Sequence, residues 1–201
     1  MVEPVSPLRS VPLGPPGADA GQRIVESAWA IARARGGSYA RARAPVSPEP
    51  RLTGNHLPGA TPLRWLRGEN KCNQFVGDAL YGAGLHMPLF RMADGSHHYM
   101  HAAALPGQRG FFARVTSRAD ILPGDILVIR QPGRGENSAH VEIITNVNRA
   151  SGVLTTLGAH PRGIEERQRV LGKGESVGEA WPKGNDRWFV LRPYATVSSE
   201  D

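Results

Sequence analysis

The second half of the sequence is a succession of short apolar runs separated by turn signals, and this pattern constrains the fold most. Runs at residues 126–129, 139–145 and 153–157 have the length of strands, and the gaps between them are rich in Gly, Pro, Asn and Ser. Short loops between successive strands favour antiparallel pairing. With further strands predicted at 165–171 and 187–193, this half of the chain predicts an antiparallel sheet.

Helical patterns come before the sheet. Residues 22–35 carry apolar side chains at helical spacing and are followed by two glycines. A second helix is predicted over residues 72–84, and a third, shorter one over 96–104. Helices first and strands second indicate an α+β domain, in which N-terminal helices pack on a C-terminal antiparallel β-sheet.

The chain of 201 residues is long enough for one domain with its own core. Residues 1–22 contain five prolines and few large apolar side chains, so we expect a flexible Pro-rich tail before a domain at 23–201. Residues 38–62, rich in Pro, Gly and Arg, predict a long surface loop. No transmembrane segment and no cleaved signal peptide are predicted.

The formal charge of +6 and the pI of about 10.1 favour an anionic partner such as a bacterial cell wall, a membrane surface or nucleic acid. The arginines are scattered and accompany no recognition motif, so no nucleic acid is predicted as a partner. A single cysteine excludes an intramolecular disulfide and a Cys-rich zinc site.

That cysteine, Cys72, stands at the predicted start of the helix at 72–84. Backbone N–H groups and the helix dipole at this position lower the pKa of a thiol and favour the nucleophilic thiolate. A lone cysteine can equally be a small buried hydrophobic residue. Position alone leaves both interpretations open.

A thiol nucleophile needs an imidazole to take its proton and a further polar group to orient that imidazole. His140 opens the predicted strand at 139–145 and is the candidate base, although it could be an ordinary strand-end residue. His160 follows the next strand and can reach across to orient the ring, although it could be a loop histidine. Among the other histidines, His97 and His101 have the i,i+4 spacing of a metal pair on a helix, but without a third ligand nearby no metal is predicted.

Three motifs occur in an order that resembles the papain-like cell-wall hydrolases of the CHAP and NlpC types. They are Lys-Cys-Asn-Gln-Phe-Val from residue 71, Leu-Pro-Gly-Asp-Ile from residue 122 and Ser-Ala-His-Val-Glu-Ile-Ile from residue 138. The resemblance implies a papain-like fold with Cys72 as nucleophile and His140 as base. It also implies His160 as the third member, because Gly158 stands where CHAP enzymes have Glu.

In this resemblance the backbone N–H of Cys72 helps to hold the oxyanion, and three amide side chains are candidate oxyanion or substrate contacts, or else ordinary helix-cap residues: Asn70, Asn73 and Gln74. The mechanism requires no cofactor. The implied activity is that of a cysteine peptidase or amidase cleaving an amide bond of peptidoglycan.

Without a signal peptide, an enzyme of this kind fits a type VI secretion effector, an antibacterial toxin made in the cytoplasm and acting in the periplasm of a target bacterium. A cognate immunity protein is then an expected partner. A phage-type endolysin, a papain-like hydrolase or deamidase acting on a protein, and a non-catalytic binding module are the alternatives.

Overall fold

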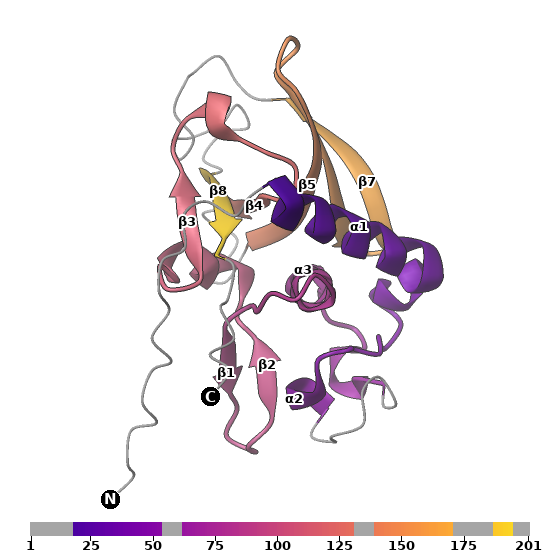
Figure 1. Ribbon diagram of the computed structural model, residues 1–201. Coiled ribbons are helices and arrows are strands. Elements are labelled where there is room, and N and C mark those ends of the chain that lie inside the picture. The colour runs from indigo at the N-terminus through magenta and orange to yellow at the C-terminus, as the bar shows by residue number, and fades with distance from the viewer. Residues whose placement is uncertain (1–17, 54–61, 131–138, 171–186, 195–201) are drawn as a thin grey trace, which may run out of the picture.

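A computed structural model describes residues 18–53, 62–130, 139–170 and 187–194 of the chain. Within these residues the fold is α+β, with a helix at the N-terminal end and a six-stranded antiparallel sheet, which confirms the predicted class (Figure 1). Most of the predicted tail lies outside the described residues. Its last residues do not, and they belong to the first helix.

Two helices carry the N-terminal part of the core. Helix α1 (Ala18–Arg35) begins earlier than predicted because Ala18-Asp19-Ala20 favours helix and Ala20 is buried. Helix α3 (Cys72–Gly82) starts where the sequence predicts and is buried on almost every side, except at Asn73 and at its C-terminal turn. The chain leaves it through Gly84, whose φ of 78° favours glycine.

Short elements surround these helices. The predicted loop at 38–62 contains helix α2 (Pro50–Thr53) and follows the 3-10 turn η1 (Gly36–Tyr39), while residues 54–61 lie outside the described part of the chain. Three more 3-10 turns are η2 (Arg64–Leu66), η3 (Ala102–Gly107) and η4 (Arg118–Asp120).

The predicted helix at 96–104 is wrong. The chain forms a hairpin of strands β1 (Leu89–Arg91) and β2 (His97–Tyr99) instead. Gly95 takes a φ of 86° and the Asp94 carboxylate accepts hydrogen bonds from the backbone N–H and hydroxyl of Ser96. This Asp-Gly turn is a hairpin signal and outweighs the weak helical spacing that follows it.

The main sheet has the strand order β3-β8-β4-β5-β6-β7. The strands β4 (Ile126–Arg130), β5 (Ala139–Asn148), β6 (Val153–His160) and β7 (Gly163–Val170) form the meander that the short loops predict. Strand β8 (Arg187–Pro193) then returns beside β4. The edge strand β3 (Phe112–Val115), which the sequence analysis did not predict, pairs with β8.

Both faces of this sheet bury apolar side chains. On one face, Val128, Val141 and Leu157 join a cluster with α1 and α3, the helices that lie over the sheet in Figure 1. On the other face, Leu127 and Ile144 belong to a second, smaller cluster. The first four residues of β4 are therefore buried, in keeping with their unbroken apolar sequence, and Arg130 at its end is half-buried.

The Pro-Gly-Asp turn before β4 packs directly against α1 and connects it to the sheet. A Cβ atom on Gly124 would lie 2.4 Å from the Cα of Gly21, so the two glycines let the turn and the first part of α1 touch backbone to backbone. Asp125 accepts two hydrogen bonds from the Arg192 guanidinium, at 2.8 and 2.9 Å, which joins the turn to β8. None of the helices in the described residues is long and apolar enough to cross a membrane.

Candidate active site

The thiol of Cys72 lies where the N-terminus of α3 meets the sheet. Only 5% of the residue is exposed, and α3 contacts both β5 and β6. The backbone N–H groups of Asn73 and Val141 hydrogen-bond to the sulfur. One of these donors comes from the first turn of the helix and the other from β5, so the sulfur is bound at the junction of the two elements.

Strands β5 and β6 separate at this junction. Their pairing begins beside the hairpin turn and ends at Ile143 and Leu157, although β5 continues back to Ala139 and β6 continues to His160. The part of β5 that no longer pairs with β6 still pairs with β4 and carries His140. The backbone N–H of Val141 there interacts with the Cys72 sulfur. The gap between the two strands therefore holds the reactive groups.

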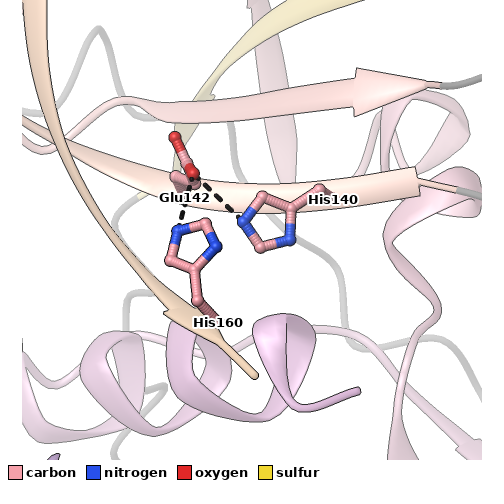
Figure 2. A group of neighbouring side chains, drawn as sticks. All are labelled: His140, Glu142 and His160. Carbon is pink, nitrogen blue, oxygen red and sulfur yellow. Dashed lines mark hydrogen bonds and ion pairs between the residues drawn. The ribbon is translucent and has the colours of Figure 1, made fainter. Parts of the chain in front are cut away.

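His140 links the thiol to a buried carboxylate. Its ring interacts with the Cys72 thiol, and its Nε2 lies 3.0 Å from Oε1 of Glu142. Figure 2 shows the His140 ring and the His160 ring directed at the same carboxylate.

The electrostatics of the pair favour a thiolate beside an imidazolium. Burial alone would raise the pKa of the Cys72 thiol, but the His140 ring and the two backbone N–H groups lower that pKa below its ordinary value. Burial likewise opposes a charged His140, yet Cys72 and Glu142 together raise the pKa of the ring to about 9. Between these two pKa values both groups are ionised.

Glu142 is the functional candidate that the sequence analysis missed. Its carboxylate is fully buried and accepts hydrogen bonds from Thr156 at 2.7 Å and from the Arg169 guanidinium, including Nε at 2.9 Å. Burial would raise the pKa of this carboxyl, but His140, His160 and Arg169 hold it far below its usual range. The signal was available, because residues i and i+2 of a strand share one face.

His160 lies beside these groups but does not hold the hydrogen bond to His140 that the sequence predicts for the orienting residue. The two rings are 4.6 Å apart between centroids. Nε2 of His160 lies 3.2 Å from Oε1 of Glu142, an ion-pair distance, but without hydrogen-bond geometry. Glu142 therefore orients His140, and His160 packs against that pair.

Gly158 provides the space for this arrangement. A Cβ atom there would lie 2.8 Å from Cγ of Glu142 and 3.4 Å from Nε2 of His140. The resemblance places the third catalytic residue of CHAP enzymes at this position. In this chain the carboxylate comes from the neighbouring strand, and the missing side chain makes room for it.

The three predicted amide contacts have different surroundings. Asn73 donates to the backbone carbonyls of Tyr99 and Met100, at 3.2 and 3.4 Å, and so fixes β2 beside the start of α3. Gln74 is buried and donates to Asp78. Asn70 is exposed, two residues before Cys72, and is the one of the three whose side chain makes no hydrogen bond to the described residues, so it is the candidate oxyanion or substrate contact.

The histidines of the β1–β2 hairpin belong to an aromatic group. The His98 ring stacks on Trp65 with centroids 3.6 Å apart and planes 7° apart, and Phe90 contacts both His98 and His101. Among the described residues, one group of side chains could bring metal ligands together: His140, Glu142 and His160. The Arg169 guanidinium and the Thr156 hydroxyl already occupy both oxygens of Glu142, and a neighbouring cation opposes a metal ion there.

Comparison with protein-family models, with curated proteins and with solved structures gives no match to this chain. A thiol, an imidazole and a carboxylate in hydrogen-bonded series can carry out nucleophilic attack with general acid–base catalysis.

Proposed function

We propose that the chain is a cysteine-dependent hydrolase of the papain-like CHAP and NlpC type that cleaves an amide bond in bacterial peptidoglycan. One observation carries the proposal: the buried Cys72 thiol at a helix N-terminus interacts with His140, which lowers the pKa of the thiol, and Nε2 of His140 is bound to Glu142 at 3.0 Å. A structural cysteine needs neither contact. The order of the three sequence motifs supports the same family.

The mechanism uses residues of this chain only. The Cys72 thiolate attacks the amide carbonyl, and the backbone N–H at the start of α3 stabilises the negative charge that forms on the oxygen. His140 gives its proton to the departing amine, which leaves an acyl group on the sulfur. His140 then takes a proton from a water molecule, whose oxygen attacks the thioester and releases the carboxylic acid and the free thiol. Glu142 keeps the ring oriented throughout.

The charge of the chain supports a wall substrate. With a formal charge of +6, the protein is attracted to the carboxylates of peptidoglycan. The proposed biological setting is antibacterial: a toxin delivered by a secretion system into the periplasm of another bacterium, with an immunity protein that covers the site in the producing cell.

The deciding experiment is digestion of purified peptidoglycan followed by mass spectrometry of the soluble muropeptides. The native protein should release products whose masses identify the broken amide. Cys72→Ala should release none. Asn70→Ala, an exposed neighbour, should lower the rate only partly if that amide contacts the oxyanion.

Alkylation by iodoacetamide at neutral pH separates the alternatives. If Cys72 is reactive but the protein digests no wall preparation, the substrate is a protein and not peptidoglycan. An unreactive Cys72 would overturn the catalytic interpretation altogether.

A further inference from the structure

An open hollow on the surface is lined by three arginines from two segments of the chain. Its volume is about 720 Å³. One segment precedes α2 and the other contains η2. The lining residues are Gly37, Ser38, Arg43, Ala44, Pro62, Arg64 and Arg67.

The arginines of this hollow have no anionic partner in the described part of the chain. Arg43, Arg64 and Arg67 are all exposed, and none takes part in an ion pair or a side-chain hydrogen bond there. No lining residue is acidic. Other arginines of the protein, such as Arg169 and Arg192, are bound to carboxylates. The hollow therefore concentrates positive charge that the described fold does not use.

Backbone hydrogen bonds join this hollow to the candidate active site. The carbonyl of Arg41 accepts from the Gly68 N–H at 2.8 Å and from Nζ of Lys71 at 3.0 Å. The N–H of Arg41 donates to the carbonyl of Pro161, the residue after His160. The segments that carry the arginines are thus fixed to the residue before Cys72 and to the end of β6.

The separation suits one short peptide. Five residues lead from Arg67 to Cys72, so their Cα atoms lie at most about 18 Å apart. An extended peptide of about five residues is therefore long enough to reach from Cys72 to Arg67. A peptide with its scissile amide at Cys72 can therefore place a charged group several residues away in the hollow.

We propose that this hollow binds free carboxylates of the wall peptide whose amide Cys72 attacks, and so selects acidic stem peptides. The inference rests on the proposed function for the identity of the substrate. Guanidinium groups bind carboxylates through two parallel N–H donors, and a concave site with several such groups favours a ligand with more than one carboxylate. Teichoic-acid phosphates carry the same charge and are the alternative source of the anion.

The test measures binding apart from cleavage. The Cys72→Ala protein is sedimented with purified sacculi that lack teichoic acid, either untreated or with their carboxylates converted to amides by carbodiimide and ammonia. Arg64→Gln/Arg67→Gln in the same background removes two charges of the hollow. Arg33→Gln/Arg109→Gln removes two exposed arginines elsewhere and is the matched control.

We expect the hollow variant to bind untreated sacculi about tenfold more weakly than the control variant, and amidation to lower binding of the control to the level of the hollow variant. Equal binding by the two double variants overturns the proposal, and so does binding that amidation leaves unchanged. If inorganic phosphate competes for binding while amidation of the sacculi has no effect, the hollow binds phosphate. That result also overturns the proposal that it binds carboxylates. Arg43→Gln, on the other segment, repeats the test if the double variant does not fold.

The outcomes keep the two proposals apart. If the native protein digests no peptidoglycan, the proposed function fails, while the binding comparison still decides the role of the hollow. If the native protein digests peptidoglycan and the hollow variant binds and cleaves like the control, the inference about the hollow fails alone.

Discussion

Four side chains, of which Cys72 is the first, form a series whose charges alternate in sign. A thiolate is followed by the His140 imidazolium, the Glu142 carboxylate and the Arg169 guanidinium, each in contact with the next. Each opposite neighbour favours the charged form of the group beside it, which offsets the cost of burying these charges. The state of the nucleophile therefore depends on a carboxylate that does not touch the thiol.

This dependence predicts a change in the pH profile of Glu142→Gln. Cys72 and Glu142 together raise the pKa of His140 to about 9, so the imidazolium of the native protein persists up to that pH and is lost above it. Without the carboxylate the pKa of His140 falls, so the alkaline limb of kcat/KM should move to lower pH and the maximum should drop by roughly 100-fold. Rates of muropeptide release from pH 5 to 10 measure both effects.

Glu166→Gln is the control for this variant, because Glu166 is exposed on β7. Its profile should match that of the native protein. An alkaline limb at the same pH in Glu142→Gln as in the native protein would show that Glu142 does not set the charge of His140.

A methyl group at Gly158 should disable the site. Gly158→Ala places Cβ 2.8 Å from Glu142, so the carboxylate must move away from His140. We expect activity to fall at least about tenfold and the free energy of unfolding to fall by about 1–3 kcal/mol. Gly107→Ala, where a Cβ meets nothing within 4 Å, is the control for each measurement. Full activity in Gly158→Ala would mean that the position of Glu142 is unimportant.

At the scale of elements, one buried carboxylate joins the helices and the hairpin below the site. Asp78 of α3 accepts hydrogen bonds from four side chains that come from η1, the segment before α2, α3 itself and β2. They are Tyr39 at 2.5 Å, Ser47, Gln74 at 3.0 Å and Tyr99 at 3.3 Å. This network fixes the surroundings of α3, and hence the direction from which its N-terminus presents the thiol.

The network predicts a pH-dependent contribution to stability. Burial raises the pKa of Asp78 to about 6 even though its donors oppose the shift, so the folded state binds this proton more tightly than the unfolded state, where the ordinary value of 3.8 applies. Asp78 therefore contributes stability that is fully present below about pH 3.8 and is lost as the pH rises through 6. Asp78→Asn should remove this component.

Urea unfolding between pH 4 and 8 checks the prediction. The free energy of unfolding of the native protein, less that of Asp78→Asn, should decrease as the pH rises from 4 to 6. Taking the difference cancels the opposite trend from Glu142, whose pKa is lowered by folding. A difference that is constant with pH would contradict the raised pKa.

At the scale of the molecule, the sheet is completed by a strand from the C-terminal part of the chain. Strand β8 lies between β3 and β4, so β4 reaches its second hydrogen-bonded neighbour only when residues 187–193 are in place. Val190 and Leu191 of β8 are buried, one in each apolar cluster. Folding of the domain therefore requires a contact between segments more than fifty residues apart.

A chain that ends at residue 186 should not fold. Without β8 the buried strand β4 has an open edge, and such edges promote aggregation. We expect no cooperative thermal transition by circular dichroism and aggregates in size-exclusion chromatography. A chain that ends at residue 194 retains β8 and is the control. A folded monomer from the shorter chain would show that β8 is dispensable.

Much of this fold could be predicted because the periodicities of helices and strands depend on residues that are close together in the sequence. The spacing after Cys72 predicts α3, the apolar runs predict β4, β5 and β6, and the short loops between strands predict the antiparallel meander. The prediction failed where the local signal is weak. The Asp94-Gly95 turn forms a hairpin where the spacing predicts a helix. The short edge strand β3 has no distinctive sequence pattern.

The sequence by itself determined helices α1 and α3, the strands of the meander, the α+β class and two candidate catalytic residues. Only the tertiary structure decided which groups meet. One extra residue, Thr145, bulges from β5 and shifts its register with β6, which brings Gly158 beside Glu142. Register and strand separation result from packing over the whole sheet, and a shift by one residue changes which side chains face each other. The sequence places Glu142 on the same strand face as His140, but only the folded chain shows that the two side chains meet, at 3.0 Å.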